Sequence, residues 1–316
     1  MKATKITLFK NIYKVSTPNG NYALKKVKTE VEKLLFYLAA MDYLWEKGFY
    51  QMSRPFKNIE GGLYVAHESD LYFLTEWIEG DYIDFSQKKQ LDAAISLLAD
   101  MHRRGEGFVP PQECIVRNDL GRWPGKWHQR ITDLRIMAEL SQRQKDDFDR
   151  VFSKIVSISL EEAYQALNII GSAGYQDYYR SLNDLKPLCH RDFVYHNLIF
   201  NGDGAFLIDF EYCIQDSRLI DLVRFVRTCY IEYPWEMDTA QRIIFGYHER
   251  YPLTITEKKL LLAVLMFPHD IWRTGHKWYF SQQRNKSLYH FLCQHCRFYN
   301  HKYQLWRNLE QGFLSC

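Results

Sequence analysis

Two short stretches, His190-Arg191-Asp192-Phe193-Val194-Tyr195-His196-Asn197 and Ile208-Asp209-Phe210-Glu211, carry most of the information about the fold of this chain. Between them, Asn201-Gly202-Asp203-Gly204 separates two apolar runs, at 198–200 and 205–208. Gly and Asn between β-prone runs are typical of a tight hairpin turn. The spacing therefore predicts a polar loop, then a hairpin, then a second acidic residue at the far end of the hairpin.

The polar residues of these stretches match the needs of phosphoryl transfer. That reaction requires a carboxylate that orients the attacking hydroxyl and accepts its proton, and oxygen ligands that hold Mg²⁺ on the phosphates. In kinases a His-Arg-Asp loop, an Asn five residues after that Asp and an Asp-Phe pair occur in this order. We therefore expect Asp192 to be the catalytic base, Asn197 and Asp209 to be metal ligands, and ATP and Mg²⁺ to be the cofactors. The alternative is that these are ordinary polar loop residues.

The first eighty residues predict a small, β-rich region. Runs at 12–15 and 22–27 surround an Asn-Gly turn, which is a strong hairpin signal. Residues 29–47 have apolar side chains at helical spacing, and Gly48 suits the end of a helix. A second hairpin is expected at 63–66 and 71–75. The predicted order is strand, strand, helix, strand, strand.

The remainder of the chain predicts mainly helices, after a connector at 76–81. The exception is the hairpin within 197–210. The pattern indicates an α+β, protein-kinase-like fold with two lobes, a small antiparallel-sheet N-lobe at 1–79 and a larger helical C-lobe at 80–316. The expected helical segments are 87–104, 127–168 with interruptions, 218–230, 237–250, 256–267 and 288–311.

The catalytic segments resemble the aminoglycoside phosphotransferase and choline kinase superfamily, whose loop usually reads His-Gly-Asp. Asp216-Ser217-Arg218-Leu219-Ile220-Asp221-Leu222 is similar to the Asp-Pro-x-x-Asp-Leu of that superfamily. Over most of its length the chain resembles the CotS-type spore coat proteins of endospore formers still more closely. That likeness includes 125–128, 251–254, 267–269 and 275–279, which are not general kinase features. The resemblance implies a structural role for Asp221 as an anchor of the catalytic loop.

The resemblance also implies a nucleotide site. Lys25 is expected to reach the phosphates of ATP and to pair with a helix glutamate, for which Glu32 is the first choice and Glu30 the second. Tyr37 lies nearer the place where the family carries that glutamate. An alternative for Glu32 is a first-turn carboxylate that stabilises the helix N-terminus. Glu76 and Ile78 are expected to meet adenine through backbone groups.

Two further segments bear on binding. Phe9–Tyr13, where a phosphate-covering loop is expected, contains no glycine. The resemblance places 269–279 beside an acceptor pocket, and its aromatic and charged residues would then grip a substrate. The alternative is that they serve helix packing and a solvated face. The residues concerned are Asp270, Trp272, Arg273, His276, Trp278 and Tyr279.

Composition narrows the possible partners and compartment. The net charge is only +3 over 316 residues, which does not favour nucleic acid. We expect no membrane span, because no run approaches eighteen apolar residues, and no secretory signal, because residues 1–20 lack an apolar core. Seven cysteines without a disulfide pattern fit a reducing compartment, and Cys293 and Cys296 are expected to be partly buried thiols. We expect a location in the mother-cell cytoplasm, the spore coat, or both.

Three functions compete at this point. The first is an ATP-dependent phosphotransferase acting on a hydroxyl of a small molecule or of a glycan or other surface component. The second is a protein kinase, which the lack of a long activation segment between Asp209 and Asp221 disfavours. The third is a non-enzymatic coat component that keeps the fold for binding, with other spore coat proteins as partners. The complete set Lys25, Asp192, Asn197 and Asp209 favours the first.

Overall fold

The computed structural model describes residues 2–9, 12–143, 145–232, 237–297 and 299–313. The chain divides into two compact units. The first unit comprises Met1–Asp119, Leu182–Cys229 and Ile243–Pro252, and the second comprises Leu120–Ser181, Tyr230–Arg242 and Leu253–Cys316. The lobe boundary between residues 79 and 80 stays a prediction.

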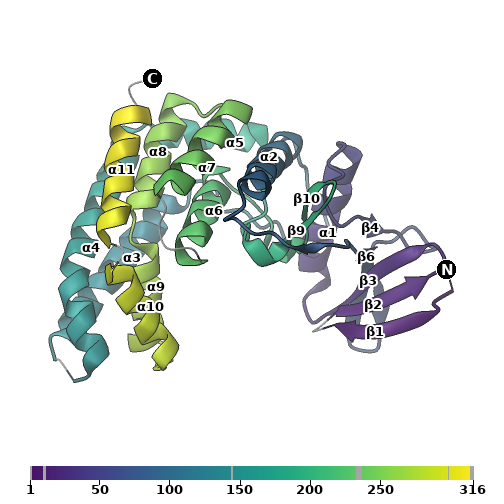
Figure 1. Ribbon diagram of the computed structural model, residues 1–316, viewed down its shortest axis with the longest axis horizontal. Coiled ribbons are helices and arrows are strands. Elements are labelled where there is room, and N and C mark those ends of the chain that lie inside the picture. The colour runs from purple at the N-terminus through teal and green to yellow at the C-terminus, as the bar shows by residue number, and fades with distance from the viewer. Residues whose placement is uncertain (1, 10–11, 144, 233–236, 298, 314–316) are drawn as a thin grey trace. The chain divides into compact units, whose positions relative to one another are not determined.

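An antiparallel sheet forms the N-terminal part of the first unit (Figure 1). Its strands run in the order β1-β2-β3-β6-β4, and β5 also pairs with β6. The expected strands at 12–15 and 22–27 fall within β2 and β3, whereas β1 was not expected. The strands are β1 (Lys5–Phe9), β2 (Ile12–Thr17), β3 (Gly20–Val27), β4 (Pro55–Phe56), β5 (Val65–His67) and β6 (Asp70–Glu76).

Two helices and two small sheets complete the core of the first unit. Helix α1 (Val31–Glu46) buries Leu34, Phe36 and Leu38 completely, and α2 (Lys88–Arg104) ends just before Gly105. The predicted hairpin at 197–210 is present, because β9 (Leu198–Asn201) pairs antiparallel with β10 (Gly204–Leu207). The short strand β7 (Asp81–Tyr82) pairs with β9 and extends this hairpin, and β8 (Leu188–Cys189) and β11 (Ile214–Gln215) pair with each other in a separate two-stranded sheet.

The second unit is helical. Among its helices, α8 begins with a complete capping box, in which Thr254 and Glu257 bond each other's backbone N–H groups. Helices α5, α6 and α7 have residues in both units. The helices are α3 (Trp123–Ser141), α4 (Asp147–Ser172), α5 (Tyr175–Leu185), α6 (Leu219–Glu232), α7 (Met237–Arg250), α8 (Ile255–Met266), α9 (His269–Tyr279), α10 (Lys286–Arg297) and α11 (Tyr299–Phe313).

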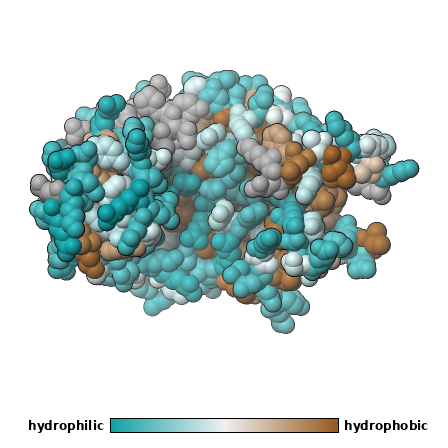
Figure 2. All heavy atoms as spheres, turned by 90° about the horizontal axis from the view of Figure 1, so that it is seen from below, coloured by the Kyte–Doolittle hydropathy of each residue, from teal (hydrophilic) through white to brown (hydrophobic). Residues whose placement is uncertain are grey.

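The described part of the chain holds no helix that combines the length and the apolar character of a membrane span. On the face drawn in Figure 2, hydrophobic residues occur as separate groups among hydrophilic ones. Cys293 and Cys296 on α10 are half-buried free thiols. Burial, and then the neighbouring Cys293, raise the pKa of Cys296 to about 11, which keeps its thiol protonated at neutral pH.

Candidate active site

The loop between β8 and β9 holds Asp192 and Asn197 against each other. Asn197 Nδ2 donates to Asp192 Oδ2 at 2.9 Å and to the Asp192 backbone carbonyl, also at 2.9 Å. Asn197 is buried, whereas the Asp192 side chain is 23 % exposed. Because the Asn197 amide nitrogen is fixed on Asp192, its Oδ1 atom is the end left for a cation. The predicted base and one predicted metal ligand are therefore held together by direct hydrogen bonds.

A buried carboxylate on α6 anchors this loop. Asp221 Oδ2 accepts from the His190 backbone N–H at 2.6 Å, and Asp221 Oδ1 accepts from the Arg191 N–H at 2.5 Å. His102 Nε2 on α2 lies 3.0 Å from Asp221 Oδ2, and its Nδ1 lies 2.8 Å from the Tyr247 hydroxyl. The contacts fit the anchoring role that the family resemblance implied. Although His102, Cys189 and Asp221 bring possible metal ligands together, these hydrogen bonds already occupy both His102 nitrogens and both Asp221 oxygens.

Two residues of the site, Arg191 and Asp209, have a strained backbone conformation. Arg191 has φ of +67° and Asp209 has φ of +67°. For residues other than glycine this left-handed conformation costs about 1 kcal/mol, and such strain gathers at functional sites. Arg191 gains an ion pair with Asp119 at 3.3 Å. The strained turn at Asp209 directs its carboxylate to Lys25.

Lys25 on β3 pairs with the predicted metal ligand. Its Nζ atom lies 2.9 Å from Asp209 Oδ1, and its side chain is 12 % exposed. No ion pair joins Lys25 to Glu32 among the described residues, and the role of Glu32 at the nucleotide site stays a prediction. Helix α1 begins at Val31, so Glu32 lies in its first turn with an exposed side chain. The helix-terminus alternative for Glu32 is therefore favoured, and Glu30 pairs with Lys33.

Tyr37 on α1 lies within the electrostatic influence of two acidic residues of the site, Glu211 and Asp209. It is buried, and its hydroxyl has no hydrogen-bond partner in the part of the chain that the structure describes. Burial, together with Glu211 and Asp209, raises the pKa of Tyr37, so the phenol stays protonated at neutral pH. Burial and Asp209 likewise raise the pKa of Glu211, which Lys25 partly opposes.

The connector contains the two residues that are expected to meet adenine, Glu76 and Ile78, and their backbone groups differ in hydrogen bonding. The Glu76 N–H donates to the Arg54 carbonyl at 2.8 Å, so this donor is committed within the sheet. Ile78 has no backbone hydrogen bond to any described residue. Ile78 thus keeps groups for adenine, and the roles of Glu76 and Ile78 stay predictions. Within the segment Phe9–Tyr13, Lys10 and Asn11 lie outside the described residues.

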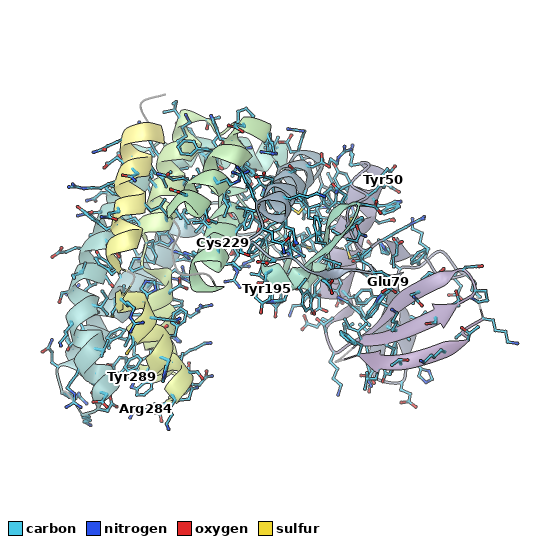
Figure 3. All side chains as sticks on the ribbon, in the orientation of Figure 1. Tyr50, Glu79, Tyr195, Cys229, Arg284 and Tyr289 are labelled. Atoms are coloured by element: carbon cyan, nitrogen blue, oxygen red, sulfur yellow. The ribbon has the colours of Figure 1, made fainter. Side chains whose placement is uncertain are left out.

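Sequence reasoning missed Arg224 on α6. Its Nη2 atom lies 3.0 Å from Asp192 Oδ1, so this guanidinium contacts the predicted base directly. Figure 3 marks Tyr195 in the catalytic loop and Cys229 on α6, the two segments that supply Asp192 and Arg224. The signal available in the sequence was the spacing of one helical turn between the anchor Asp221 and Arg224.

The segment 269–279 forms α9 in the second unit, and its contacts there favour packing. Trp278 stacks on Phe148 with ring centroids 4.0 Å apart. Trp272 Nε1 donates to Asp133 at 2.8 Å, and the Tyr279 hydroxyl donates to Asp149 at 2.6 Å. Three of the aromatic side chains singled out in the sequence are thus bound within the second unit, and an acceptor pocket at this segment stays a prediction.

The donor set fits a hard divalent cation. Asn197 offers an amide oxygen, Asp209 keeps Oδ2 beyond its bond to Lys25, and Mg²⁺ prefers oxygen ligands of this kind. Lys25 neutralises the carboxylate now and is long and flexible enough to turn to a phosphate oxygen. The residues present therefore agree with a nucleotide and its metal.

Comparisons with known proteins show the family and the fold of this chain. The family model described as "Spore coat putative kinase YutH" matches residues 1–305. Spore coat protein S of Bacillus subtilis (strain 168) is 24 % identical over 280 residues, covering 88 % of this chain and 80 % of the relative. The aminoglycoside phosphotransferase structure from Alicyclobacillus acidocaldarius has a TM-score of 0.85 at 20 % identity, with 98 % of this chain and 92 % of that chain covered. The α+β, protein-kinase-like fold is thereby confirmed.

A further solved structure holds ligands. An amicoumacin kinase in complex with AMP-PNP, Ca²⁺ and Ami has a TM-score of 0.60 at 14 % identity, covering 97 % of this chain and 88 % of that chain. Neighbours with this fold therefore include kinases seen with a nucleotide analogue and a divalent cation.

Proposed function

This chain belongs to the spore coat putative kinase YutH family, and on that premise we propose that it is an ATP-dependent phosphotransferase of the spore coat. It would act on a hydroxyl of a small molecule, or of a glycan or other spore component. The observation that carries the proposal is the contact between Asp192 and Asn197 beside the Lys25–Asp209 pair. A base, two oxygen ligands and a phosphate-reaching lysine are the parts that phosphoryl transfer requires.

In this mechanism the acceptor hydroxyl donates a hydrogen bond to Asp192. The bond from the acceptor oxygen to the γ-phosphorus forms while the bond from that phosphorus to the ADP oxygen breaks, and the hydroxyl proton passes to the Asp192 carboxylate. Asn197 Nδ2 holds Oδ2 of that carboxylate in place at 2.9 Å. The anchor Asp221 fixes the loop backbone, so Asp192 needs little rearrangement before transfer.

The other two residues serve the nucleotide. Mg²⁺ held by Asn197 Oδ1 and Asp209 would supply positive charge to the phosphates. Lys25, whose ammonium group now pairs with Asp209, would donate to a phosphate oxygen of a bound nucleotide. Nucleotide binding is therefore expected to depend on a divalent cation.

The test compares three variants in nucleotide titrations by calorimetry, with and without Mg²⁺. Asp209→Asn should weaken Mg²⁺-dependent binding, and Lys25→Ala should weaken binding without unfolding the protein. Asp192→Asn should bind normally and lose transfer by about 10²–10⁴-fold, because the general base is missing. Equal affinity of the wild type with and without Mg²⁺ would refute the assigned metal ligands.

The relatives named as coat proteins motivate a second candidate, a structural coat component without activity. An Asp192→Asn allele in the spore-forming host separates the two. Spores that assemble normally with this allele but not with a deletion would assign the fold a structural role. Defects equal to those of the deletion would show that the chemistry is needed.

A further inference from the structure

Arg224 places an open cationic group beside the predicted base. Its guanidinium uses one Nη2 hydrogen bond, to Asp192 Oδ1 at 3.0 Å, and makes no other hydrogen bond or ion pair with the described residues. Arginine has five N–H donors in a rigid plane, so most of them are left for a ligand. The side chain is 32 % exposed, which leaves it accessible from solvent.

The position of Arg224 is fixed by the same helix that anchors the loop. Asp221, one turn earlier on α6, bonds the backbone N–H groups of His190 and Arg191. Phe225, the next residue, packs edge-on against Phe193 of the loop with ring centroids 5.1 Å apart. Two independent contacts thus hold α6 against the catalytic loop, and Arg224 is held at the base rather than free on a surface.

The charge of Arg224 selects among acceptors. A hydroxyl bonded to Asp192 Oδ1 at about 3 Å lies within about 6 Å of Arg224 Nη2, because that nitrogen is itself 3.0 Å from the same oxygen. At this distance the guanidinium attracts an anion, which two of its parallel N–H groups can bind, and it opposes the attraction that the Asp192 carboxylate exerts on an ammonium group. Asp192 retains acceptor capacity on both oxygens, since each carboxylate oxygen takes two hydrogen bonds.

We propose that the acceptor carries an anionic group, a carboxylate or a phosphate, a few bonds from the reactive hydroxyl, and that Arg224 binds this group. This inference rests on the proposed function and adds the chemical class of the acceptor to it. Arg224 would be a substrate-binding residue that determines specificity.

The experiment uses matched acceptors that differ in one charged group. The carboxylate arm compares gluconate with sorbitol and with N-methylglucamine. The phosphate arm compares glycerol 3-phosphate with glycerol and with 3-amino-1,2-propanediol. Turnover is followed as ADP release above the acceptor-free rate, and products by ³¹P NMR. Thermal stabilisation by each compound is measured beside Mg²⁺ and AMP-PNP.

We expect an anionic compound to exceed its neutral and cationic counterparts at least tenfold in kcat/KM, or to stabilise the protein where they do not. Arg224→Gln should reduce this preference at least tenfold, mainly through KM, while Mg²⁺-dependent AMP-PNP binding is retained. Arg224→Lys, which keeps the charge but not the planar fork, should fall between them.

The two levels of the hypothesis fail separately. If the wild type does not bind AMP-PNP with Mg²⁺, the proposed function itself fails. If it binds the nucleotide but no anionic compound is preferred in turnover or stabilisation, the inference about Arg224 is overturned and the proposed function stands. The inference is likewise overturned if Arg224→Gln lowers turnover of all acceptors by the same factor.

Discussion

The two compact units position their important side chains by different means. In the first unit the surroundings of Asp192 are charged and hydrogen-bonded, with Asp221 accepting from two loop N–H groups. In the second unit stacked rings connect several of the helices, as in Trp278 on Phe148 and Trp127 on Phe267, whose centroids lie 4.3 Å apart. The hydrogen bonds of the first unit fix the orientation of the Asp192 loop, whereas the rings of the second unit fill the space between helices.

The contrast shows which residue types report on function in this chain. Trp and Tyr residues in α9 look suited to ligand binding, yet the structure places them in packing contacts of the second unit. Arg224 looks like an ordinary helix residue, yet it contacts Asp192, the predicted base, and keeps open donors toward the described residues. In this chain an unused hydrogen-bond donor beside a predicted catalytic group is therefore a better indicator of a binding residue than an aromatic side chain is.

The largest effect is expected where the polar network of the first unit is broken. Asp221→Ala removes the acceptor for His190 N–H, Arg191 N–H and His102, and leaves these donors buried. We expect a loss of about 3–5 kcal/mol in the free energy of unfolding, measured by urea unfolding with circular dichroism. The control Asp177→Ala removes an exposed ion pair with Arg180 and should change little. A loss below about 1 kcal/mol would remove Asp221 as the anchor.

A smaller effect is expected from overfilling the second unit. A Cβ atom at Gly275 would meet Phe152 ring atoms at 2.7 Å and Met137 Sδ at 2.8 Å. Gly275→Ala should therefore cost about 1–3 kcal/mol in the same unfolding measurement, with Mg²⁺-dependent nucleotide binding retained. Gly171→Ala on α4 is the control, since nothing lies within 4 Å of its Cβ, and it should be neutral or slightly stabilising. A stabilised Gly275→Ala protein would contradict the tight packing of α9.

The third change concerns Tyr37, a buried polar side chain of the first unit whose hydroxyl bonds none of the residues that the structure describes. Tyr37→Phe removes this buried hydroxyl and should raise the free energy of unfolding by about 1 kcal/mol in nucleotide-free protein. Tyr43→Phe on the same helix should lose a similar amount, because its hydroxyl donates to the Glu106 carbonyl. A destabilised Tyr37→Phe protein would mean that this phenol is bonded in solution.

The smallest effect concerns Glu211 and pH. Burial and Asp209 raise its folded pKa above the ordinary 4.5, so the folded state binds this proton more tightly than the unfolded state. Its contribution to stability is therefore present below pH 4.5 and is lost as pH rises through the folded pKa. Glu211→Gln should raise Tm by at most about 2 °C at pH 7, because the side chain is partly exposed. A gain that persists at pH 4 would contradict this origin.

Local patterns predicted the parts of the site that depend on spacing along the chain. The loop, the hairpin and the positions of Asp192, Asn197 and Asp209 follow from turn residues and short offsets. The partner of Lys25 did not follow, because an ion pair across 184 residues depends on how β3 approaches Asp209. Strand β1 was missed because its five residues are exposed and give no burial pattern. Arg224 was missed because an arginine on a helix normally lies at the surface.

The left-handed backbone at Arg191 also bears on how this sequence can vary. The related loop usually carries glycine there, which adopts φ of +67° without cost, whereas arginine in this chain is accompanied by its ion pair with Asp119. The two positions are thus coupled, so that a change at one alters the effect of a change at the other. Among relatives, we expect an acidic residue at position 119 where position 191 is arginine, and a variable residue type at position 119 where position 191 is glycine.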